Sequence, residues 1–142
     1  MTDKTMLMMS KKTIQPVTLF DSRPYGFSQV VVVPSGKMVF ISGQVAWDAE
    51  KQLVGEGDLA VQVHKALQNL QSAIESVGGT LEDIVLLHLY LVDYQQDQGA
   101  VISDALLKFF NPGSLPASSW ICVPGLANPG FLIEIEAQAR ME

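Results

Sequence analysis

The clearest hydrophobic pattern lies at the C-terminal end of the chain, where apolar and polar residues alternate. From Phe131 to Ala139 every second residue is apolar, and the residues between them include Glu134, Glu136 and Gln138. A period of two places successive side chains on opposite faces of a strand. This pattern predicts a strand with one apolar face and one face that carries two carboxylates about 7 Å apart.

A long amphipathic helix is predicted in the middle of the chain. Apolar residues recur at helical spacing from Leu59 to Val77, and Gln62 is expected on the opposite, polar face. Asp58 precedes the helix as a favourable N-cap, and Gly78-Gly79 follows it as a stop signal.

A second helix is predicted from Gly99 to Phe110, with Phe109 on its packed side and Asn111-Pro112-Gly113 at its end. The run from Ile84 to Val92 is almost continuously apolar and too short for a buried helix, so it predicts a strand covered on both faces. The long helix can cover one face, and we expect a neighbouring subunit to cover the other.

The remaining strands are shorter. Residues 13–20 are weakly strand-like, residues 29–33 and 37–42 flank a Pro-Ser-Gly turn and predict a hairpin, and residues 118–123 predict a strand before the last one. The element order predicts an α+β fold, a two-layer α/β sandwich with a mixed sheet and two helices on one face. We expect one domain over residues 13–142 and a disordered leader over residues 1–12.

Composition narrows the functional classes. The net charge of −6 and a pI near 4.8 argue against a nucleic-acid partner. The mean hydropathy of +0.23 is high for a chain of 142 residues, which favours burial of apolar surface between subunits. The single cysteine, Cys122, fits a reducing compartment, and no stretch is long enough for a membrane helix, so we expect a cytoplasmic protein.

No phosphate-binding glycine motif and no clustered His or Cys ligands occur in the sequence, so we expect neither a cofactor nor a metal. Small polar groups do occur at the predicted strand ends, and these suit acid–base work on water or a small molecule. They are Tyr25, Ser42-Gly43-Gln44, Ser118-Ser119 and Glu134.

Several short motifs together resemble the RidA/YjgF family of reactive-intermediate deaminases. They are PYG around Tyr25, ISGQ at 41–44, Gln62 and Asn69 along the helix, GGTLEDIV at 78–85, LPAS at 115–118 and IEIEA at 133–137. The resemblance extends from about Val17 to Ala139. It implies a chorismate-mutase-like fold assembled as a homotrimer, with ligand clefts between adjacent subunits.

The best-known members of this family hydrolyse 2-imino acids to 2-keto acids and ammonia without a cofactor. The resemblance implies catalytic roles for Glu134, Tyr25 and Ser42. Ser118 falls where those members have an arginine that binds the substrate carboxylate, and this substitution argues against a 2-iminobutanoate or 2-iminopropanoate deaminase.

The remaining candidates line the same expected cleft. Substrate-binding roles are predicted for Gly43, Gln44, Ser118, Ser119 and Trp120, and possible roles for Arg23, Cys122 and Phe109. We expect a RidA-like hydrolase of a small imine, enamine or related carbonyl–nitrogen metabolite. The alternative is a non-catalytic ligand-binding or chaperone-like trimer, and a ribonuclease is the weakest alternative because the chain is acidic.

Overall fold

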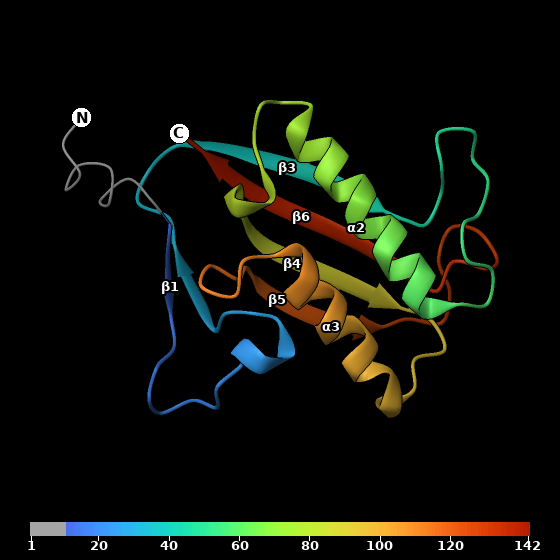
Figure 1. Cartoon of the computed structure of the whole chain (residues 1–142), viewed down its shortest axis with the longest axis horizontal. Helices are drawn as coiled ribbons and strands as arrows, with labels where there is room; N and C mark the ends of the chain where they lie inside the picture. The colour runs from blue at the N-terminus through green and yellow to red at the C-terminus, as the bar shows by residue number, and fades with distance from the viewer. Residues whose placement is uncertain (1–10) are drawn as a thin grey trace.

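Four strands form a mixed sheet in the computed structural model, which describes residues 11–142 (Figure 1). Their order across the sheet is β3 (Lys37–Gln44), β6 (Ile133–Met141), β4 (Ile84–Leu91) and β5 (Ala117–Cys122). β6 is antiparallel to both of its neighbours, whereas β5 is parallel to β4. The parallel pair arises because the chain crosses over through a helix between β4 and β5.

Two helices, α2 (Leu59–Glu75) and α3 (Gly99–Phe109), cover one face of this sheet (Figure 1). α2 begins as predicted, because the Asp58 side chain accepts a hydrogen bond from the Val61 amide at 3.1 Å. Single-turn 3-10 helices occur at η1 (Arg23–Tyr25), η2 (Leu81–Asp83) and η3 (Gln96–Gln98). The predicted fold class, a mixed sheet with two helices on one face, is confirmed.

The other face of the sheet is open in the single chain. Leu87 and Leu89 of β4 are buried against the helices, whereas His88 and Tyr90 are only half-buried on the opposite side. On β6 the alternation is equally clear between residues 131 and 139, as predicted. Within one subunit, β4 is therefore covered on one face, and its second face is available to a partner.

The predicted hairpin between residues 29–33 and 37–42 is wrong. β2 (Val30–Val32) pairs with β1 (Lys12–Ile14), and β3 pairs with β6 instead. The intervening turn contains Gly36 at φ +122°, and Arg140 near the end of β6 donates from Nε to the Ser35 carbonyl. β6 is a longer partner for β3 than the three-residue β2, so the pairing with more ladder bonds prevails.

The predicted polar-face position of Gln62 is also wrong, because this side chain is completely buried under two connecting segments. The predicted leader lies outside the described residues except for its last two. Of these, Lys12 begins β1 and the Lys11 ammonium donates to the Ile84 carbonyl at 2.7 Å. Within residues 11–142 no helix is sufficiently long and apolar to cross a membrane.

Candidate functional site

Glu134 of β6 lies directly against the backbone of Gly43 in β3. The pairing register between β3 and β6 shifts between Ile41 and Gln44, so Gly43 lies in a bulge. A Cβ atom at Gly43 would lie 2.6 Å from the carboxyl carbon of Glu134. A side chain at position 43 would therefore displace the Glu134 carboxylate from this place.

Two side-chain amides of α2 hold the segments that carry Gly43 and Glu134. Asn69 donates to the Val45 and Trp47 carbonyls, both at 2.8 Å, just after the bulge. Gln62 accepts from the Leu132 amide at 2.9 Å, two residues before Glu134. Both strands are thereby fixed to the same helix at the end of the ladder where Gln44 pairs with Ile135.

Gln62 also donates to two carbonyls, that of Gly55 at 3.0 Å and that of Gly130 at 2.9 Å. Its amide group thus satisfies three backbone groups from two connections. A buried amide with this bonding is structural, and it explains why the glutamine is inside the molecule.

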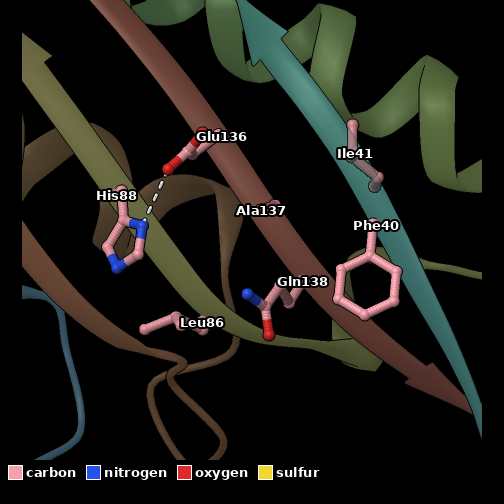
Figure 2. A pocket seen from close by; sticks show the side chains of 7 residues that line it. All are labelled: Phe40, Ile41, Leu86, His88, Glu136, Ala137 and Gln138. Atoms are coloured by element: carbon pink, nitrogen blue, oxygen red, sulfur yellow. Dashed lines mark hydrogen bonds and ion pairs between the residues drawn. The ribbon is translucent and has the colours of Figure 1, made fainter.

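The second carboxylate of β6, Glu136, belongs to a hydrogen-bonded network on the open face of the sheet. His88 Nδ1 lies 2.8 Å from Glu136 Oε1, and the Tyr90 hydroxyl donates to the same oxygen at 2.7 Å. Figure 2 shows the His88 and Glu136 side chains meeting from neighbouring strands, with Phe40 and Gln138 farther along this face. The hydrogen bond from Tyr90 and then that from His88 lower the pKa of Glu136, and the Tyr90 pKa is raised in turn.

The two carboxylates are therefore chemically different. Glu136 is committed to two partners, and its lowered pKa makes it a weak proton acceptor. Glu134 has no side-chain hydrogen bond or ion pair with any residue from 11 to 142, and it is half-buried beside Gly43 and opposite Tyr90.

The residues on either side of Gly43, at the C-terminal end of β3, form few side-chain contacts. Ser42 is exposed, and Gln44 donates from its side chain to the Ser42 carbonyl at 3.0 Å. Both residues remain within one or two positions of Gly43, so the SGQ segment and Glu134 form one group of predicted site residues.

Tyr25 belongs to a different group, an aromatic pocket at the β5 edge of the sheet. Phe20, Tyr25, Phe27 and Trp120 line a cavity of about 240 Å³. The Phe20 ring meets those of Tyr25 and Phe27 edge to face, at centroid distances of 6.1 and 6.3 Å. More than half of the Tyr25 side chain is exposed.

The loop that carries Tyr25 is anchored on both sides. The buried Ser22 hydroxyl donates to the Phe27 carbonyl at 2.7 Å, which closes the loop. Ser28 donates from its backbone N–H to the Pro116 carbonyl at 2.9 Å and from its hydroxyl to the Leu115 carbonyl at 2.5 Å, immediately before β5. Gly26, at φ +93°, allows the loop to approach Leu106 of α3 closely.

The register of β5 separates the predicted binding residues. Ser118 and Trp120 pair with Leu87 and Leu89, so they face the helix layer, whereas Ser119 pairs with His88 and faces the open side. The Ser118 hydroxyl and the Trp120 indole nitrogen are buried and have no hydrogen-bond partner among the described residues. Each unpaired buried group costs about 1 to 3 kcal/mol.

The three possible site residues are placed as follows. Arg23 forms a bidentate pair with Asp21, with Nε–Oδ1 at 2.7 Å and Nη2–Oδ2 at 2.8 Å. Cys122 is a free, exposed thiol at the end of β5. Phe109 packs on the core and meets the His64 ring at 5.0 Å, away from the aromatic pocket.

The predicted site residues thus form two groups in one chain. The first contains Glu134 and the SGQ segment at the β3–β6 boundary, and the second contains Tyr25, Ser118 and Trp120 at the β5 edge. β6 and β5 are separated by β4, so their backbones are about 10 Å apart. The Ser118 and Trp120 side chains also leave the sheet on the side opposite to the Glu136 network.

Two parts of this arrangement were missed by the sequence analysis. Its candidate site residues do not include His88, Phe20 or Phe27. The available signal was the i, i+2 spacing of His88 and Tyr90 on a strand, which places both on one face. Only the β4–β6 register shows that Glu136 is opposite His88 and that Glu134 is opposite Tyr90.

Together, the sandwich and its polar and aromatic groups define a YjgF-type α+β protein whose site suits acid–base chemistry on a small molecule. Among residues 11–142 no cluster of three or more His, Cys, Asp or Glu residues is arranged to hold a metal. The family model described as Endoribonuclease L-PSP matches residues 21–141. The chain belongs to this family, the Rid/YjgF/L-PSP family.

Solved structures agree with this assignment. The chain is 39% identical to YyfB from Yersinia pestis, a Rid-family protein of unknown function, over 94% of this chain and 100% of that one, with a TM-score of 0.90. It is 27% identical to yeast YEO7 over 81% and 86% of the two chains, with a TM-score of 0.66. The YjgF gene product of E. coli is 26% identical over 75% and 83%, with a TM-score of 0.65.

Proposed function

We propose that this protein hydrolyses a small imine, enamine or related carbonyl–nitrogen metabolite in clefts between the subunits of a homotrimer. The observation that carries the proposal is the free carboxylate of Glu134, held over the Gly43 backbone while Glu136 is committed to His88 and Tyr90. A positioned, unpaired carboxylate next to exposed polar groups suits activation of water.

The chemistry needs no redox step. Glu134 accepts a proton from water, whose oxygen attacks the imine carbon, and the nitrogen takes up a proton. The C–N bond then breaks, which leaves a carbonyl compound and ammonia. Tyr25 and Ser42 orient the substrate, and backbone N–H groups around Ser118 stabilise the developing negative charge.

A second subunit completes this site. Glu134 and Tyr25 are in different groups of one chain, so a water activated by one does not meet a substrate oriented by the other. If the β5 edge of one subunit lies beside the β3–β6 boundary of the next, the two groups face each other. The open sheet face, with Phe40 73% exposed, is then covered by the neighbouring chains.

Ser118 occupies the position at which the best-known family members have the substrate-binding arginine. We therefore expect this protein to belong to a branch of the family without that arginine. A serine offers one neutral hydrogen bond where a guanidinium offers two charged ones, a loss of about 2 to 4 kcal/mol for a carboxylate ligand. Arg23 does not compensate, because both of its contacting nitrogens bind Asp21. The substrate is therefore less dependent on a carboxylate than a 2-imino acid is.

The same serine favours a second candidate function, a non-catalytic trimer that binds a small ligand in the cleft. The two candidates are distinguished by an assay in which an amino-acid or amine oxidase generates imines in situ and semicarbazide traps the free imine. The hydrolase proposal predicts saturable imine loss that Glu134→Ala abolishes. If the wild type is inactive and Ser118→Arg is active, the scaffold supports catalysis and the natural ligand lacks the carboxylate that an arginine would bind. If both are inactive, the non-catalytic binding protein is favoured.

A further inference from the structure

The aromatic pocket has a composition that fits an apolar group. All four of its lining residues, Phe20, Tyr25, Phe27 and Trp120, are aromatic, and none is charged. The loop that supplies Tyr25 is fixed by the Ser22 and Ser28 hydrogen bonds, so the pocket is formed before a ligand arrives. A preformed apolar cavity binds by burial of apolar surface.

The lining of the pocket contains no cation to bind an anionic group of a ligand. Arg23 is the nearest cation in sequence to Tyr25, and its hydrogen bonds to Asp21 lower the pKa of that carboxyl to about 2. Asp21 is therefore ionised at neutral pH and keeps Arg23 paired. Ser118, on the neighbouring strand, is neutral.

Two polar atoms of β5 have no hydrogen-bond partner among residues 11–142. They are the Ser118 hydroxyl and the Trp120 indole nitrogen, and both atoms are buried within one chain. A ligand in the pocket therefore contacts the aromatic rings that line it and not these two atoms.

We propose that the aromatic pocket binds an aromatic or branched aliphatic substituent of the substrate, so that the substrate class is imines and enamines with a large apolar group and no required carboxylate. This inference rests on the proposed hydrolase function for its reaction. Hydrolysis adds water across the C=N bond, the oxygen stays on carbon and the nitrogen leaves as ammonia, while the apolar substituent is unchanged.

Binding is tested without catalysis, on the assembled protein, with phenylacetamide and acetamide as probes. The chain has two tryptophans, so its two indole N–H signals in an NMR spectrum report on Trp120 and Trp47 separately. We expect phenylacetamide to bind at least about tenfold more tightly than acetamide and to shift the Trp120 signal. Trp120→Ala should lose this preference, and Trp47→Phe, which assigns the second signal, should keep it.

Equal affinity for the two amides, or a shift at Trp47 alone, would overturn the inference. Protection of Trp120 from both probes in the assembled protein would also overturn it, and would assign the pocket to a second copy of the chain.

Substrate preference is tested with imines that a flavin amine oxidase generates from phenethylamine and from ethylamine. We expect kcat/KM for the phenyl-bearing imine to exceed that for the small one at least about tenfold, and Trp120→Ala to remove the difference. Hydrolysis without any preference would refute the pocket assignment while the hydrolase function stands. If phenylacetamide binds but neither imine is hydrolysed, the proposed hydrolase function is refuted and the assignment of the apolar pocket stands.

Discussion

Gly43 and Glu134 show how a single residue can decide whether a site exists. The glycine is required by contact rather than by its backbone angles, because a side chain would occupy the space of the Glu134 carboxylate. The sequence placed Gly43 at a predicted strand end and a carboxylate on the last strand as two separate features. That the two meet depends on the β3–β6 register, which no local pattern contains.

Gly43→Ala should therefore displace the Glu134 carboxylate and lower kcat at least about tenfold while the fold is retained. The measurement is steady-state imine hydrolysis together with circular dichroism. Gly125→Ala is a matched control, because a Cβ there meets no atom within 4 Å. Unchanged kcat in Gly43→Ala would contradict the role of this contact.

The hydrogen bonds that Glu136 accepts predict a loss of folding stability at acidic pH. Its pKa is lowered in the folded protein by Tyr90 and His88, so its contribution to stability is complete above the ordinary carboxyl value of 4.5 and is lost as the pH falls through the lowered value. Glu136→Gln removes this titration.

The difference in unfolding free energy between wild type and Glu136→Gln should accordingly shrink as the pH decreases below about 4.5. Urea unfolding at several pH values measures it. A difference that stays constant across this range would show that the network does not stabilise the ionised carboxylate.

At the scale of elements, local signals were sufficient for some features and not for others. The Asp58 cap and the alternation along β6 depend on neighbours in sequence, and both were predicted. The partner of β2 was not, because strand pairing is decided by competition between distant segments, and β6 was the better partner for β3. Gln62 is buried for a similar reason, since the segments around Gly55 and Gly130 cover it.

At this scale, we predict that replacing Gln62 lowers the stability of the fold. Gln62→Leu leaves three partly buried backbone groups without their partner and should lower the unfolding free energy by about 2 to 4 kcal/mol. Gln68→Leu, at an exposed position of the same helix, should change it by less than about 0.5 kcal/mol. Chemical denaturation of the wild type and of the two variants measures these differences. Equal effects of the two substitutions would refute the bridging role of Gln62.

At the scale of the whole molecule, the open sheet face and the separation of the site residues into two groups both predict that the chain assembles into an oligomer. The apolar face around Phe40 and the network of His88, Tyr90 and Glu136 are only half-covered in one chain. The high apolar content predicted burial between subunits, but which face would be left open required the sheet order. We expect an assembled mass about three times that of the 15.5 kDa chain.

Phe40→Asp places a charge on this face and should weaken assembly, so that light scattering coupled to size exclusion detects a lower mass at micromolar concentration. Val77→Asp, at an exposed apolar residue just after α2, is the control and should leave the mass unchanged. An unaltered mass in Phe40→Asp would show that this face is not the interface.

The most direct test of the account combines the chemistry with the assembly. Glu134→Ala and Tyr25→Ala are each expected to be inactive alone, because every cleft then lacks one group. Unfolded together in equal amounts and refolded, they should recover about one quarter of wild-type imine hydrolysis, since that share of clefts pairs an intact Glu134 with an intact Tyr25 from the next subunit. No recovery above the separate variants would contradict a site built from two subunits.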